Sequence, residues 1–195
     1  MPYKQDLLKV KPTEFPLAPG RILVSVPYFN DSFFNRSVVL LTDYDPQQRQ
    51  CAGLIINHQL DYSVEQVVDG LHVQDPLYLG GPVQPAALFL LHNFESCTAS
   101  SRIVPNVYVG YDKVLLALIE TRAIPGMRYK FAMGYAGWAP GQLEDELGNN
   151  MWVVANPTPE LVFDTPSDKI WEKAVTILGD DYRHWLKIPK FVNLN

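Results

Sequence analysis

The sequence is poor in cysteine and in positive charge. Its 195 residues include two cysteines, Cys51 and Cys97, and neither has a cysteine or histidine nearby at the spacing of metal ligands. Lys and Arg number 16 against 21 Asp and Glu, so the net charge is -5. We therefore expect no metal, no cofactor and no direct nucleic-acid binding, since phosphate backbones are bound through clustered cations.

Long apolar runs are absent as well. No stretch approaches the roughly 20 apolar residues of a membrane span, and the opening residues, MPYKQDLLKVKPTEFPLAPG, lack the apolar core of a signal peptide. We expect a cytoplasmic protein without membrane contact. Free thiols fit such a reducing compartment better than a disulfide does.

The composition is that of a folded globular chain, with 47% hydrophobic and 19% charged residues. Its length suits one domain. The first 19 residues contain four prolines and little periodicity. Residues 1–19 are therefore expected to form an N-terminal arm, and residues 20–195 a single domain.

Beyond residue 20, short runs rich in β-branched residues alternate with a few helical patterns. Strands are predicted over residues 21–27, 37–42, 51–57, 76–79, 86–93, 102–109, 127–135 and 151–155. Helices are predicted over residues 63–70, 112–122, 140–148, 167–179 and 181–191. Because the strands come in clusters, the expected class is α+β, with a mixed, mostly antiparallel sheet and a few flanking helices.

Residues 135–147, YAGWAPGQLEDEL, form the first candidate site. Much of this segment is typical of a helix start. Pro140 stands where the first helical residue is expected, and Leu143 and Leu147, four apart, supply an inward face. The carboxylates that follow are favoured by the positive end of the helix dipole.

The same segment also offers a surface for a small molecule. Gln142 and Glu146, four residues apart, share a helix face beside the glycine-bearing turn at Trp138. An acid and base pair made of Glu144 and Glu146 is disfavoured, because residues two apart on a helix point in different directions.

Two further features carry both a structural and a functional interpretation. Gly80 and Gly81, in LYLGGPVQ, are typical of a tight turn between strands, and such a loop also suits an anion. His92 ends an apolar run, where a histidine is commonly a hydrogen-bonded core residue and sometimes a catalyst.

Several stretches in order resemble the YqgE/AlgH family of bacterial proteins: LAPGRILVSVP, FFNRSVVLLT, AGLIIN, LGGPV, LFLLH, GYAGWAPGQLEDEL, MWVVA and IWEKAVTILG. The resemblance runs from about residue 17 to the C-terminus. It implies a cytoplasmic protein whose bifurcated sheet folds into a pseudo-barrel, and some members carry the label of transcriptional regulator. The family motif positions are Asn57, Gly80, Gly81, Pro82, His92, Gly134, Gly137, Trp138, Gln142, Glu144 and Glu146, and no agreed catalytic role accompanies them.

The motifs favour a non-catalytic regulatory module that binds a small molecule or a protein partner. They are rich in glycine, aromatic and amide residues and contain no recognisable nucleophile or metal set. The candidate ligand-binding residues are Gly80, Gly81, His92, Trp138, Gln142 and Glu146. The alternative is an enzyme, a hydrolase, that uses His92 with Glu144 or Glu146.

Overall fold

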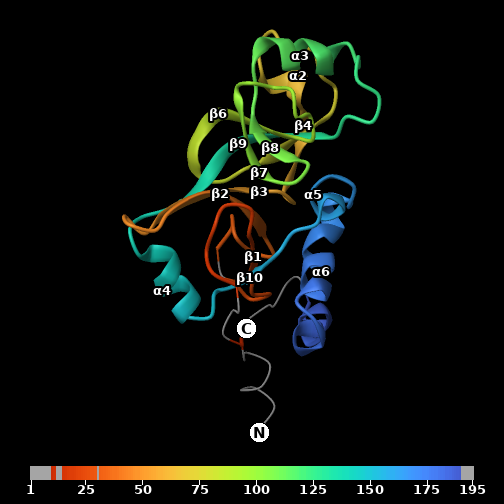
Figure 1. Cartoon of the computed structure of the whole chain (residues 1–195). Coiled ribbons are helices and arrows are strands. Elements are labelled where there is room, and N and C mark those ends of the chain that lie inside the picture. Colours follow the sequence, from red (N-terminus) through yellow and green to blue (C-terminus); the bar gives the residue numbers. More distant parts are fainter. Residues whose placement is uncertain (1–9, 12–14, 30, 190–195) are drawn as a thin grey trace, which may run out of the picture.

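The computed structural model describes residues 10–11, 15–29 and 31–189, which form ten strands, five α-helices and one 3-10 helix (Figure 1). The strands are β1 (Ile22–Ser25), β2 (Val38–Asp45), β3 (Gln50–Ile55), β4 (Gln59–Ser63), β5 (Pro76–Leu79), β6 (Val83–His92), β7 (Ser100–Val104), β8 (Val107–Gly110), β9 (Tyr129–Trp138) and β10 (Trp152–Ala155). The helices are α2 (Val64–Val67), α3 (Lys113–Glu120), α4 (Gln142–Gly148), α5 (Pro159–Phe163), α6 (Ser167–Ile177) and the 3-10 helix η1 (Asp180–Lys187).

Strand β9 joins two groups of strands. The strand order is β10-β1-β2-β3-β9-β6-β8-β7, and each neighbouring pair in it is antiparallel. Strand β6 covers one edge of β9. On the other edge, β3 pairs with residues 136–138 and β5 runs parallel to residues 131–133. Two strands therefore share one edge of β9, and the sheet forks there.

Glycines make this fork possible, because they let backbones touch. The Gly80 N–H donates to a β9 carbonyl at 2.8 Å, and the Gly80 carbonyl accepts the Ile55 N–H at 2.9 Å. A Cβ at Gly81 would lie 2.2 Å from the Tyr135 backbone. A Cβ at Gly134, where φ is +67°, would lie 2.4 Å from the Gly81 carbonyl oxygen. No side chain fits at these positions.

The sheet also curls back on itself. Strand β7, the last in the order, reaches the turn before β1, where a Cβ at Gly20 would lie 2.9 Å from the Ile103 carbonyl oxygen. Among the described residues β7 pairs with β8 alone, so the sheet does not close. The expected class, α+β with a mostly antiparallel sheet curled into a pseudo-barrel, is confirmed.

Two apolar cores lie on opposite faces of the central strands. Phe131 packs in the smaller core, which α2 and α3 cover, whereas the next residue, Ala132, belongs to the larger one. Helix α6 packs on the larger core through Ile170 and Trp171, and the Trp171 indole donates to the Ser25 carbonyl at 2.9 Å. In Figure 1, α2 and α3 lie at one end of the molecule, and α4 and α6 flank the other.

The two ends of the chain differ in detail from the expectation. The helix predicted over residues 181–191 is the 3-10 helix η1, with Tyr182 and Trp185 buried, and residues 190–191 lie outside the described part. In the arm, Leu17 packs against the larger core and the Lys11 ammonium lies 2.6 Å from an Asp181 carboxylate oxygen. Residues 1–9 and 12–14 are outside the described residues, and the boundary at residue 20 stays a prediction.

Among the described helices, none combines the length and apolar character that crossing a bilayer requires.

Replacing Gly134 by alanine tests the fork. We expect a loss of about 3 kcal/mol in the free energy of unfolding, or no folding, because the new methyl group meets backbone and adopts a left-handed φ. Gly148→Ala is the control, since a Cβ there meets no atom within 4 Å and alanine favours helix. Urea unfolding of both variants measures the difference. If Gly134→Ala and Gly148→Ala were equally stable, Gly134 would not be required at the fork.

Candidate functional site

Residues 135–147 run from the end of β9 through a tight turn into α4. The Gly141 N–H donates to the Arg49 carbonyl at 2.9 Å, and Gly141 has a φ of +81°. The Gln142 side-chain oxygen accepts the Ala139 N–H at 3.1 Å. Gln142 therefore fixes the turn that begins its own helix. The helix starts at Gln142 after the left-handed Gly141, so the expectation that Pro140 is the first helical residue is wrong.

Glu146 is the hydrogen-bond centre of this region. Its Oε2 accepts the indole N–H groups of Trp138 at 2.8 Å and of Trp152 at 2.7 Å. Its Oε1 accepts a Gln142 amide N–H at 2.9 Å. Both indole rings are buried, so each N–H needs an acceptor inside the protein. One carboxylate thus joins β9, α4 and β10.

Glu144 lies in different surroundings. Its Oε1 is 3.3 Å from the Arg49 Nε, and its Oε2 is enclosed with no hydrogen-bond donor among the described residues. Burial, and then the nearby Glu144 carboxylate, raise the pKa of the Cys51 thiol to about 12 and also raise that of Tyr44. In the part of the chain described, Glu144 and Glu146 share no hydrogen-bond partner, and the Glu146 oxygens already accept three hydrogen bonds.

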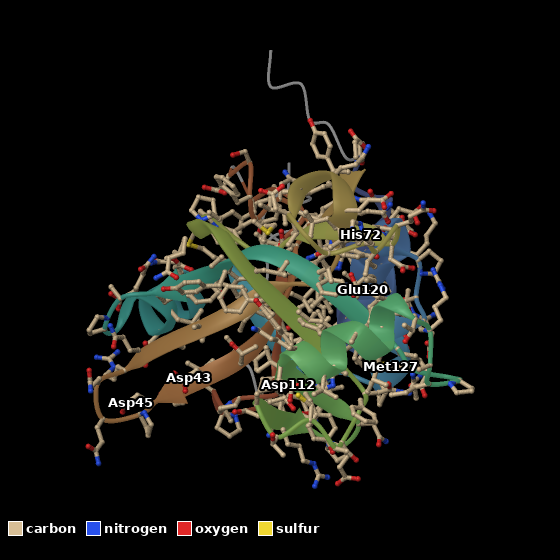
Figure 2. All side chains as sticks on the ribbon, turned by 90° about the horizontal axis from the view of Figure 1, so that it is seen from above. Asp43, Asp45, His72, Asp112, Glu120 and Met127 are labelled. Carbon is tan, nitrogen blue, oxygen red and sulfur yellow. The ribbon has the colours of Figure 1, made fainter. Side chains whose placement is uncertain are left out.

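The two glycine-bearing segments meet beside a shallow hollow of about 410 Å³. Asp43 and Asp45 of β2 (Figure 2) line it together with Tyr135 and Trp138 of β9. Of the six candidate ligand-binding residues, Trp138 alone lines this hollow. The N–H of Gly80 is already bonded to β9, so it is not free to bind an anion.

His92 is placed far from the carboxylates of α4. It pairs with Tyr129 at the start of β9, whereas Trp138 ends that strand nine residues later, beyond the bend at Gly134 and at most about 30 Å along the chain. The His92 Nε2 lies 3.1 Å from the Gly110 carbonyl, and its Nδ1 accepts the Phe94 N–H at 3.2 Å. Burial lowers its pKa. The structure therefore does not support the hydrolase arrangement of His92 with Glu144 or Glu146.

A second cavity, of about 390 Å³, lies where the loop before β2, the end of β3 and the start of α6 meet. Sequence reasoning missed it, although Asn57 is one of the family motif positions. Its lining residues carry amide, guanidinium, imidazole, hydroxyl and carboxylate groups around one indole: Asn35, Arg36, Asn57, His58, Ser167, Asp168, Trp171 and Glu172.

Arg36 is the cation in the wall of this cavity, and its guanidinium is held by two contacts. Its guanidinium carbon lies 4.6 Å from the centre of the Trp171 ring, a cation–π contact, and one terminal nitrogen donates to the Ile188 carbonyl. The Arg36 backbone has a φ of +49°, a conformation uncommon for residues other than glycine. The Asn57 side chain stabilises it, because the Asn57 amide donates to the Arg36 carbonyl at 2.9 Å.

His58 contributes an imidazole to the same wall. Burial lowers its pKa, so it is mainly neutral at pH 7. Its Nε2 lies 3.2 Å from the Ser37 hydroxyl oxygen, a spacing found in nucleophile and base pairs. However, Ser37 has no exposed surface and its hydroxyl donates to the Phe33 carbonyl at 2.8 Å. A fully enclosed hydroxyl cannot attack a substrate, so the pair is structural.

Lys130 of β9 is a buried cation beneath this region. Burial lowers its pKa to about 8. Its ammonium donates to the Ile56 carbonyl at 3.0 Å and lies 4.7 Å from the centre of the Tyr78 ring. These contacts stabilise the end of β3, directly before Asn57. Among the described residues, no group of His, Cys, Asp or Glu side chains is arranged to hold a metal ion.

Replacing Glu146 by alanine should cost about 3 kcal/mol of stability, because two buried indole N–H groups lose their acceptor. Asp145→Ala, an exposed change on the same helix, is the control and should cost under about 0.5 kcal/mol. Chemical unfolding followed by tryptophan fluorescence measures both. If the two variants were equally stable, Glu146 would not hold the region together.

Cys51 should react slowly with thiol reagents although it lines the hollow. Its pKa of about 12 leaves almost no thiolate at pH 7.5. A Cys97→Ala variant leaves Cys51 as the one thiol. We expect Cys51 to be labelled at least tenfold more slowly in native buffer than in urea, where the protein is unfolded. A fast native rate, equal to the unfolded one, would contradict the raised pKa.

Known proteins resemble this chain in sequence along most of its length. A UPF0301 protein of Chlorobium luteolum is 32% identical over 182 residues, which is 92% of this chain and 95% of the relative. A UPF0301 protein of Idiomarina loihiensis is 34% identical over 172 residues, 83% of this chain and 91% of the relative.

Solved structures agree as well. The solution structure of the AlgH protein from Pseudomonas aeruginosa is 26% identical, with a TM-score of 0.68 over 85% of this chain and 93% of that one. A crystal structure from Corynebacterium diphtheriae, 22% identical with a TM-score of 0.73 over 94% and 98% of the two chains, shares the fold. The family model described as AlgH-like matches residues 22–183, and the chain therefore belongs to the AlgH-like family.

Proposed function

We propose that this protein is a non-catalytic regulatory module that binds a small molecule in the cavity beside Arg36. The observation that carries the proposal is the cavity itself. Its volume of about 390 Å³ suits a small metabolite, since ligand pockets commonly measure about 300–1,000 Å³. Three separate segments bring polar groups to its wall around one apolar ring, Trp171.

The absence of catalysis is part of the proposal. The polar groups that first suggest chemistry are engaged in holding the fold. Glu146 accepts three hydrogen bonds, both ring nitrogens of His92 have partners, and the Ser37 hydroxyl is enclosed. A general base or a nucleophile needs a free lone pair within reach of a substrate.

The six residues chosen from the sequence take a different part in this proposal. Gly80, Gly81 and His92 serve the central sheet, and Trp138, Gln142 and Glu146 serve the junction of β9, α4 and β10. Direct contact between these six and a ligand stays a prediction. Their proposed function is to hold the structure around the cavity, since the ring of Phe34, two residues before Arg36, stacks on that of Trp138 at 6.1 Å.

Blocking the cavity tests the proposal. In Ser167→Tyr a large side chain occupies the cavity wall, whereas Thr176→Tyr places the same side chain on an exposed part of α6. A defined library of small bacterial metabolites is screened by NMR and thermal shift. We expect a ligand that stabilises the native protein and Thr176→Tyr but binds Ser167→Tyr at least tenfold more weakly. A library with no hit, or hits that Ser167→Tyr retains, would contradict the proposal.

A further inference from the structure

Arg36 lacks the partner that a half-buried cation normally has. Its guanidinium stays protonated at every physiological pH. Among the described residues, no carboxylate lies within ion-pair distance of it. One terminal nitrogen donates to the neutral Ile188 carbonyl, and in the part of the chain described the enclosed Nε has no acceptor. A buried donor on a cation without an acceptor is costly. Because this Nε is itself enclosed, a ligand would meet the guanidinium through its terminal nitrogens.

The carboxylates of the same cavity do not supply the missing charge. Asp168 and Glu172 lie 3.6 and 3.4 Å from the Lys169 ammonium, which pairs with both. The Glu172 charge acts on Arg36 only from beyond ion-pair distance. His58 is mainly neutral at pH 7. Among the described residues of this cavity wall, the Arg36 guanidinium is therefore the one charged group without an ionic partner.

We propose that the cavity binds the anionic group of a small molecule, a carboxylate or a phosphate, with Arg36 as its counter-charge. The inference rests on the proposed function and names the ligand class of that same cavity. The guanidinium fork matches both anions in geometry. Its contacts with Trp171 and Ile188 hold it in place before the ligand arrives, so little rotamer freedom is lost on binding.

Matched probes of one shape test the charge preference: benzoate, phenyl phosphate, benzamide and benzylamine. Each is titrated into the ¹⁵N-labelled full chain at low ionic strength. The reporters are the Trp171 indole N–H, which lies beside Arg36 and bonds to Ser25, and the Ser167 amide. We expect saturable shifts from benzoate or phenyl phosphate, with at least tenfold weaker binding of benzamide and benzylamine. The ratio of the affinities for benzoate and phenyl phosphate distinguishes a carboxylate site from a phosphate site.

The variant Arg36→Gln should weaken the binding of both anions at least tenfold and leave the affinity for benzamide unchanged. Lys113→Gln, an equal charge change at an exposed position of α3, should change neither affinity. The ratio of the benzoate affinity to the benzamide affinity is measured on the native protein. It therefore tests the anion inference even if Arg36→Gln does not fold. Benzamide binding as tightly as benzoate would overturn the anion inference and leave the proposed function standing. If none of the four probes bound, the anion inference would be overturned, whereas the proposed function is decided separately by the metabolite screen and the Ser167→Tyr variant.

Discussion

Direct backbone contact at the fork of the sheet is the constraint on which the rest of the structure depends. Strand β9 carries three partner strands, and two of them share one of its edges. That arrangement requires the turn at Gly80 and Gly81 to lie against the bend at Gly134 with no side chain between them. From this contact β9 continues to the turn before α4, and its alternating side chains enter the two cores.

At the end of β9, the carboxylate of Glu146 joins neighbouring elements, as the glycines of the fork do in the middle of the strand. Glu146 ties two buried indoles to the helix that follows the strand. Charged acceptors give stronger hydrogen bonds than neutral ones, which suits a junction of three elements. Both indoles belong to the larger core, on which α6 also packs through Ile170 and Trp171.

Much of the fold can be predicted from the sequence, and the physical reason is local. The β-branched runs of β1 and β2 and the amphipathic pattern of α6 require only neighbouring residues to be recognised. The parallel pairing of β5 with β9 joins residues about 50 positions apart along the chain, and the fork also needs β3, whose partners in β9 are more than 80 positions away. Periodicity does not report such distant pairings. The cavity was missed for the same reason. Arg36, His58 and Trp171 belong to no common motif, and only folding brings them together.

The opposite-facing cores have a consequence for how the domain unfolds. Phe131 and Ala132 are consecutive residues of β9, yet they are buried in different cores. Neither core can open without withdrawing the strand that forms a wall of the other. The two cores are therefore coupled through β9. A disturbance at the glycine fork also reaches the cavity directly, because the N–H of Leu79, the residue before Gly80, donates to the carbonyl of His58 in the cavity wall at 2.8 Å.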